Sequence, residues 1–389
     1  MTKIVRNKFK NFSVITIFFV ISHSLLFSEI TKQECKNWLL KTLQSQDDSI
    51  KIYILDNIKD TPLKEFYYEI RKLANISMND NVKLKSLYVS YKVYKDTAAL
   101  DQISKFLLQK PKIPENAPQV VKAKAYLKNQ YRAEAAKMLG ELGDEKTVDI
   151  LSKIINSDDD GNVKDAAYFA LALLSQRGRI KPLPEMREFF YSGLKDLNPK
   201  VRLQAVKYIG DLRYTDAAQP LSLRLKDTNK QVVIEAIYSL GKLRDLSVPV
   251  LQELIQFKNH PDETYRVALA DALGNIAEAV ISSTETSKIN TLTKIRNVLN
   301  EFLNDPNGMV RVTAAKSLLS LGDRTGVEVL KKGLDSNDID VIIYSVEALG
   351  KYGDKEDIKF LEKFIQHQDL KVKTAVYCNI LKIYFKTGQ

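Results

Sequence analysis

The sequence predicts an all-α protein built as an α-solenoid, a superhelix of about eight to ten helix pairs. Two observations lead to this prediction. The segment VRLQAVKYIG, which begins at Val201, returns as VVIEAIYSLG at Val232, 31 residues later. Each copy has apolar residues at its first, fifth and ninth positions, which is the spacing of one face of a helix. One helix pair of this length cannot bury its apolar stripe alone, so successive copies must stack.

The first 28 residues are predicted to be a secretory signal peptide, outside the fold. A basic leader, Lys3–Lys10, precedes an apolar core, Val14–Ile21, and small residues follow. Cleavage after Ser24 or Ser28 fits this pattern. We therefore expect an exported protein, and the Lys-, Ile- and Asn-rich composition favours the space between two bacterial membranes. The alternative is an uncleaved leader that anchors the protein to the inner membrane.

Residues 29–118 are predicted to form an N-terminal helical region with divergent repeats. Weak unit signals begin at Ile50 and Val82, 32 residues apart, and both lack the Gly found at the tenth position of clearer copies. Terminal repeats are usually atypical, so we expect these to be end units of the array. Trp38, the only tryptophan, falls on an apolar stripe and is expected to pack. The segment KPKIPENAP at 110–118 breaks any helix and is either a boundary or an ordinary long loop.

Residues 119–389 are predicted to form the regular repeat array. Successive units are 31 to 45 residues apart, and the two longest offsets contain insertions after Gln176 and Asn275. Such insertions are expected as loops on one rim of a solenoid. An Asp or Asn precedes most units and is expected to cap the following helix by accepting its free N–H groups. The units begin at Tyr131, Val163, Val201, Val232, Tyr265, Val310, Val341 and Val372.

The two cysteines, Cys35 and Cys378, lie near opposite ends of the chain. Stacked helices are about 8–10 Å apart, so an extended array is predicted to separate these residues by many tens of ångströms. A disulfide requires Cα atoms within about 7 Å. We therefore expect unpaired thiols, or a bridge between two molecules, and no disulfide within one molecule.

The repeated pattern Asp-x-x-x-Val-Arg-x-x-Ala-x-x-x-Leu-Gly, followed by Leu-Gly-Asp, resembles HEAT repeats, in particular the HEAT-like repeats named after phycobilisome lyases. The resemblance covers 119–384 well and the earlier part loosely. It implies a ladder between units, formed by the aspartate before a helix and the arginine at its second position. The implied structural pairs are Asp196 with Arg202 and Asp305 with Arg311, and Arg132 and Arg266 stand in like positions.

The sequence offers no constellation of catalytic or metal-binding residues, so we expect no enzymatic activity and no cofactor. Its only histidines are His23, His260 and His367, and none is followed by Glu, as a di-iron hydroxylase built on HEAT repeats would require. A zinc site needs clustered Cys and His, which two remote cysteines do not supply. Phosphate-binding GxxxxGK and nucleophile-elbow GxSxG motifs are absent from the sequence.

A surface that binds a partner protein is the remaining use. The resemblance implies that the second helix of each unit lines the concave face of the solenoid. Aromatic residues stand beside lysines at the seventh and eleventh positions of these helices, which suggests a groove for a segment of a partner. The alternative is that these aromatic residues simply pack between helices. The candidate residues are Lys137, Phe169, Lys207, Tyr238, Lys242 and Lys316.

Nucleic-acid binding is a second function class. The formal net charge is +11, but four of these charges lie in the leader, and the remaining excess favours anionic partners only weakly. Asp271 and Glu347 occupy the same row of positions as the lysines, and an exported protein would not meet cellular nucleic acid. A third class is a structural envelope protein that an uncleaved leader holds at the membrane. The protein scaffold remains the preferred function.

Overall fold

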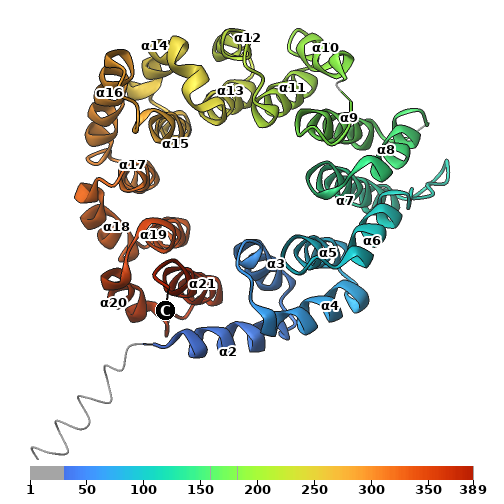
Figure 1. Cartoon of the computed structure of the whole chain (residues 1–389), viewed down its shortest axis with the longest axis horizontal. Coiled ribbons are helices and arrows are strands. Elements are labelled where there is room, and N and C mark those ends of the chain that lie inside the picture. The colour runs from blue at the N-terminus through green and yellow to red at the C-terminus, as the bar shows by residue number, and fades with distance from the viewer. Residues whose placement is uncertain (1–29, 158, 182, 389) are drawn as a thin grey trace, which may run out of the picture.

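The computed structural model describes residues 30–157, 159–181 and 183–388, and every regular element within these ranges is a helix. The predicted signal peptide, residues 1–28, lies outside the described residues. Helices alternate between an inner and an outer layer and follow each other around a ring (Figure 1). The predicted all-α solenoid is therefore confirmed. None of the described helices is both long enough and apolar enough to span a membrane.

The inner layer consists of the longer helix of each pair, except in the first pair, where α2 has 12 residues and α3 has 11. Its members are α3 (Asp48–Ile58), α5 (Asp80–Tyr94), α7 (Gln119–Leu142), α9 (Gly161–Gln176), α11 (Pro199–Leu212), α13 (Lys230–Leu243), α15 (Glu263–Val280), α17 (Gly308–Ser320), α19 (Ile339–Tyr352) and α21 (Leu370–Lys386). Consecutive members pack side by side, and their apolar faces meet the outer layer in three buried clusters that follow one another around the ring.

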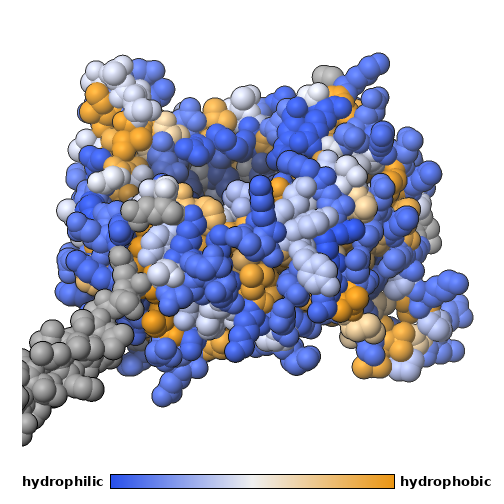
Figure 2. Space-filling view, turned by 60° about the horizontal axis from the view of Figure 1, so that its bottom comes forward, coloured by the Kyte–Doolittle hydropathy of each residue, from blue (hydrophilic) through white to orange (hydrophobic). Residues whose placement is uncertain are grey.

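The outer layer consists mostly of shorter helices, several of which pass into 3-10 turns. Its members are α2 (Lys32–Leu43), α4 (Tyr67–Ile76), α6 (Thr97–Leu107), α8 (Val148–Ile155), α10 (Pro184–Gly193), α12 (Ala218–Ser222), α14 (Leu251–Ile255), α16 (Thr286–Phe302), α18 (Val327–Leu334) and α20 (Ile358–Leu361). The 3-10 segments are η1 (Lys64–Phe66), η2 (Glu145–Thr147), η3 (Leu223–Lys226), η4 (Arg244–Val250), η5 (Gln256–Asn259), η6 (Arg324–Gly326), η7 (Lys355–Asp357) and η8 (Glu362–Phe364). Hydrophilic residues cover most of the face seen in Figure 2.

The turns before the inner helices from α9 to α21 have the expected capping chemistry, whereas α7 begins after Pro118 without a side-chain cap. Asn198 and Asn229 cap α11 and α13 by accepting the first free backbone N–H groups of these helices. Two residues earlier, the carboxylates of Asp196 and Asp227 accept the N–H of the capping asparagine at 2.7 and 2.9 Å. The Asp-x-Asn sequence therefore fixes the turn and the start of the helix together.

An arginine ladder joins neighbouring units, but with partners that differ from the expected ones. Arg202 donates to both carboxylate oxygens of Asp227, in the next unit, at 2.7 and 2.8 Å. From Asp196 only the main-chain carbonyl accepts a hydrogen bond from Arg202. The expected carboxylate pair Asp196–Arg202 is therefore wrong, because the Arg202 guanidinium reaches forward to the aspartate of the next unit.

The other arginines of the ladder follow the same rule. Arg266 pairs with both oxygens of Asp305 at 2.7 and 2.9 Å, and Arg132 pairs with both oxygens of Asp159 at 2.6 and 2.8 Å. Arg311 donates to the Asp305 carbonyl, so the expected carboxylate pair Asp305–Arg311 is also corrected. The guanidinium groups of Arg132, Arg202 and Arg266 thus tie the turn of their own unit, or the end of the preceding helix, to the turn of the next, whereas Arg311 binds only its own turn.

A glycine near the end of several inner helices allows the next inner helix to approach closely. A Cβ added at Gly241 on α13 would lie 2.6 Å from the Cα of Ala272 on α15, closer than real Cβ contacts. Gly140 on α7 stands in the same relation to Ala170 on α9. The Leu-Gly of the repeat pattern therefore has a packing role.

We expect Gly241→Ala to destabilise the protein by about 1–2 kcal/mol, because overpacking outweighs the gain in helix propensity. The measurement is the midpoint of thermal unfolding followed by circular dichroism. Gly161→Ala at the start of α9 is the matched control, since an added Cβ there meets nothing within 4 Å. Equal midpoints for the two variants would refute the packing role of Gly241.

The two ends of the solenoid meet, so the ring is closed (Figure 1). Helix α2 packs on α21, and the ring of Trp38 stacks on that of Tyr377 with centroids 4.2 Å apart and planes 7° apart. The Tyr384 hydroxyl donates to the Ile30 carbonyl at 2.5 Å. We call this contact between α2, α3 and the last inner helices the seam.

The prediction that Cys35 and Cys378 lie many tens of ångströms apart is wrong. Both are free, and both lie in one buried cluster at the seam, 0% and 2% exposed. Burial raises the pKa of each thiol to about 12. The error arose because an extended array was assumed, whereas each unit rotates relative to the one before until the ends meet.

The Pro-containing segment at 110–118 lies between α6 and α7, and these helices still pack on each other. Arg132 on α7 donates through Nε to the carbonyl of Leu107 at the end of α6, at 2.7 Å. The repeat stacking therefore continues across this segment.

Candidate functional site

The surface that the inner-layer helices turn toward the centre of the ring is the candidate site, and we call it the inner wall. Two cavities open on it, and both are lined by Asp56 and Lys59 of the α3 region. The wall is thus hollowed on both sides of α3. The cavity on the side of α17, α19 and α21 exists only because the ring is closed, whereas the other lies between the consecutive helices α3, α5, α7 and α9.

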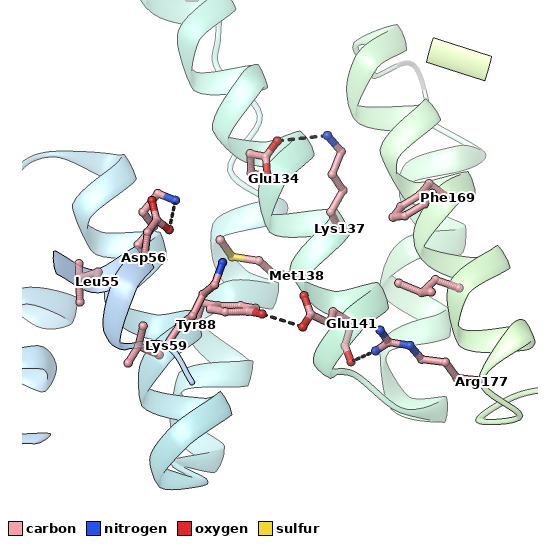
Figure 3. Close-up of a pocket in the computed structure, with 13 residues that line it drawn as sticks. Leu55, Asp56, Lys59, Tyr88, Glu134, Lys137, Met138, Glu141, Phe169 and Arg177 are labelled. Atoms are coloured by element: carbon pink, nitrogen blue, oxygen red, sulfur yellow. Dashed lines mark hydrogen bonds and ion pairs between the residues drawn. The ribbon is translucent and has the colours of Figure 1, made fainter. Parts of the chain in front are cut away.

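The first cavity, of about 260 Å³, lies between α3, α5, α7 and α9 (Figure 3). Most of its polar side chains are held by their neighbours: the Tyr88 hydroxyl donates to Glu141 at 2.7 Å, and Arg177 donates to the Glu141 carbonyl at 2.7 Å. Apolar side chains also line it. The lining residues are Leu55, Asp56, Lys59, Lys85, Tyr88, Val89, Glu134, Lys137, Met138, Glu141, Phe169, Leu173 and Arg177.

The second cavity, of about 520 Å³, lies at the seam, and we call it the seam cavity. Its walls come from α3 near the start of the described chain and from α17, α19 and α21 near its end. The lining residues are Asp56, Asn57, Lys59, Asp60, Thr61, Lys316, Tyr344, Glu347, Ala348, Lys351 and Lys382. Most of these residues carry a charged or polar group.

All six candidate binding residues lie on inner-layer helices, but several are engaged within the protein. Lys242 pairs with Asp211 at 2.8 Å and with Glu235 at 3.3 Å. Lys316 pairs with Asp271 at 3.2 Å, and Lys137 with Glu134 at 3.1 Å. These three lysines therefore offer little free charge to a partner.

The aromatic candidates are also partly used for packing. Phe169 is only 7% exposed and stacks on Tyr208 with centroids 4.6 Å apart, so only its edge reaches the first cavity. Tyr238 is half-buried, and burial raises the pKa of its hydroxyl to about 12. Lys207 is partly exposed and has no ion pair within the described ranges. Tyr238 and Lys207 are the candidates that remain available.

Apart from Lys316, sequence reasoning missed the residues of the seam cavity. Asn57, Lys59 and Lys382 were not candidates because the ends of the chain were expected to be far apart. Lys382 donates to the amide oxygen of Asn57 at 2.6 Å across the seam, and the Tyr53 hydroxyl donates to Glu347 at 2.6 Å. A signal was present, because the last helix is apolar on two faces, whereas an exposed terminal repeat needs a polar outer face.

Among the residues with described positions, no group of three or more His, Cys, Asp or Glu side chains is arranged to hold a metal ion. The polar groups that line the two cavities are mostly lysines, tyrosines and carboxylates, which suit the binding of polar and charged groups of a ligand.

Comparison with known proteins gives a family match along most of the chain. A family model described as HEAT repeats matches residues 119–183, 187–274, 251–338 and 295–378. Among solved structures, the chain is similar to the complex of CpcE and CpcF of phycocyanin lyase from Nostoc sp. PCC7120, with a TM-score of 0.39 and 19% identity over 61% of this chain and 95% of that one. A designed armadillo repeat protein gives a TM-score of 0.31 with 16% identity, over 60% of this chain and 98% of that one.

A curated relative corrects the prediction that the chain is not an enzyme. Deoxyhypusine hydroxylase from Emericella nidulans is 26% identical over 215 residues, which is 52% of this chain and 57% of the relative. The chain thus matches little more than half the length of that protein. The prediction relied on the absence of His-Glu pairs, and this finding overturns it because an enzyme shares the repeat sequence.

Proposed function

The chain belongs to the HEAT-repeat family, and we propose that it is an exported protein-interaction scaffold that binds its partner on the inner wall of the ring. Closure of the ring is the observation that carries this proposal. It brings α3 against α21, so that the seam cavity forms beside the cavity between α3, α5, α7 and α9. A concave wall with apolar patches and free charges suits a segment of a protein chain.

The proposal of export rests on the basic leader and apolar core of residues 1–28. N-terminal sequencing of the protein recovered from cells tests it. We expect the chain to start at Leu25 or Glu29. Recovery of an intact Met1 would overturn cleavage and favour a membrane-anchored protein.

Site-specific photocrosslinking in cells tests the binding surface. A photoreactive amino acid placed at Lys207 on α11 or at Lys351 on α19 samples the inner wall, and the same group at Leu223 or Lys332 samples the outer layer. We expect one dominant protein adduct from the inner positions, insensitive to nuclease, and none from the outer ones. Adducts from the outer positions alone would refute the inner wall as the binding surface, and a nuclease-sensitive adduct would favour nucleic-acid binding.

A further inference from the structure

The seam cavity contains carboxylates that already have partners. A carboxylate oxygen of each of its three acidic side chains lies 2.6 to 2.9 Å from a lysine nitrogen or a tyrosine hydroxyl oxygen. These pairs are Asp56 with Lys85, Asp60 with Lys92, and Glu347 with the Tyr53 hydroxyl. Lysines from outside the cavity therefore match the charges of Asp56 and Asp60, and Glu347, whose partner is a neutral hydroxyl, is the one carboxylate of the cavity without a paired cation.

Three lysines of the same cavity have no carboxylate partner. Lys59, Lys351 and Lys382 have no carboxylate oxygen within 4.0 Å among residues 30–157, 159–181 and 183–388. Among them, Lys382 lacks a charged partner although it is half-buried, and it donates only to the neutral amide oxygen of Asn57. Burial lowers the pKa of its ammonium group below the usual value. Buried charges in proteins are normally paired, and the single Glu347 carboxylate leaves these three lysines with an excess of positive charge.

We propose that the seam cavity binds the carboxylate side chains of an acidic peptide segment in the partner protein. This inference rests on the proposed function, because it names the chemistry of the segment that the inner wall receives. The ammonium groups of Lys59, Lys351 and Lys382 supply the counter-charges. Lysine ammonium groups act as point charges with rotatable donors, so they accept carboxylates in varied orientations.

The neighbouring cavity indicates that the segment also carries apolar side chains. It shares Asp56 and Lys59 with the seam cavity, and Leu55, Val89 and Met138 line its other parts. A segment that crosses α3 would place acidic side chains at the seam and apolar ones between α5 and α7. Acidic residues next to Leu, Ile or Phe are therefore the expected composition.

Binding at this place is coupled to closure of the ring. Lys59 belongs to the N-terminal side of the seam, and Lys351 and Lys382 to its C-terminal side. A ligand that contacts both sides binds the closed ring better than an open one. By linkage, the ligand stabilises closure, and closure strengthens binding.

Fluorescence anisotropy with the purified full chain tests the proposal. The probe is a short labelled peptide in which Glu alternates with Leu, and the reference probe carries Gln in place of Glu. We expect the Glu peptide to bind with an affinity that falls as salt rises. The Lys351→Gln, Lys382→Gln double variant should bind it about tenfold more weakly, because two attractive charges are lost.

Two controls guard this measurement. Lys332→Gln on the outer helix α18 removes an equivalent exposed charge and should leave the affinity unchanged. Lys351→Gln alone changes an exposed residue, so its effect cannot come from unfolding, and unchanged Trp38 emission shows that the seam is intact. Equal binding of the Glu and Gln peptides, or an unchanged affinity in the double variant, would overturn the proposal. Binding of inorganic phosphate at the seam without binding of the Glu peptide would also overturn it, in favour of a small anion.

The failure of this inference and that of the proposed function are distinguishable. If the double variant still captures the photocrosslinked partner in full, the proposed binding at the inner wall is supported and the proposed carboxylate site is refuted. If the Glu peptide binds at Lys351 and Lys382 but no protein adduct forms on the inner wall in cells, the proposed scaffold function is refuted and the carboxylate site is supported.

Discussion

Arg132→Ala is expected to destabilise the protein by about 3–5 kcal/mol, because it leaves a buried carboxylate without its partner. The Arg132 side chain is fully buried, and that of Asp159 is 3% exposed. The guanidinium also donates to Asn129 and to the Leu107 carbonyl, so its removal leaves several acceptors unsatisfied. Chemical unfolding followed by circular dichroism measures the loss.

Two further variants separate charge burial from the loss of packing. Replacing both partners, Arg132→Met with Asp159→Leu, should recover most of the stability, since no uncompensated charge remains. Arg187→Ala removes an ion pair with Asp216 whose side chains are about half exposed, and it should change little. A loss in Arg187→Ala as large as that in Arg132→Ala would contradict this account.

The effect of Arg132→Ala should also depend on pH. Burial raises the pKa of Asp159, but the hydrogen bonds from Arg132 outweigh this and hold the pKa below its usual value. The pair therefore stabilises the folded protein above the pKa of an unfolded aspartate, and this contribution is lost as pH falls through the folded-state pKa. In the variant, protonation of the unpaired Asp159 carboxylate removes its buried charge and with it most of the destabilisation. The difference between the two proteins should thus shrink in acid.

The sequence predicted the units of this fold well because each unit carries its own local signals. The apolar spacing from Val201 and Val232 predicts helices, and the Asp or Asn before each unit predicts where they begin. These are interactions between residues that are near in the chain. They depend little on the overall shape.

Closure of the ring was not predicted, because it depends on a small rotation between units that is summed over the whole array. A local pattern does not encode such a sum with the accuracy that closure requires. The same limit applies to the ladder, where Arg202 prefers Asp227 in the next unit over the nearer Asp196. The seam cavity was missed for this reason, since Lys59 and Lys382 are neighbours only in the closed ring.

One feature of the sequence does point to closure. The last helix, α21, buries residues on both of its faces, including Ala375, Cys378 and Ile380. An array that ends in solvent needs a polar outer face on its terminal repeat. An apolar terminal helix therefore requires a cover, and in this chain α2 and α3 provide it.

Cys35→Asp is expected to open the ring without unfolding the array. Cys35 is fully buried at the seam, so an aspartate there places an unpaired carboxylate in an apolar interface at a cost of several kcal/mol. Neighbouring units stabilise each other along the array, so the remaining interfaces should keep their helices. We expect near-native helical content, a larger radius of gyration in solution scattering, and red-shifted emission from Trp38 as its stack on Tyr377 is lost.

The same variant leaves Cys378 as the only thiol of the chain, which makes alkylation a direct measure of opening. In the closed ring Cys378 is buried, and its pKa of about 12 keeps the reactive thiolate scarce. Opening should expose it and speed its alkylation more than about tenfold, since each 1.4 kcal/mol shifts an equilibrium tenfold. Asn37→Asp adds the same charge at an exposed position of α2 and should leave scattering, emission and Cys378 reactivity unchanged, with Cys35 replaced by Ser in that control. If the two aspartate variants behave alike, the ring is not held closed by this interface in solution.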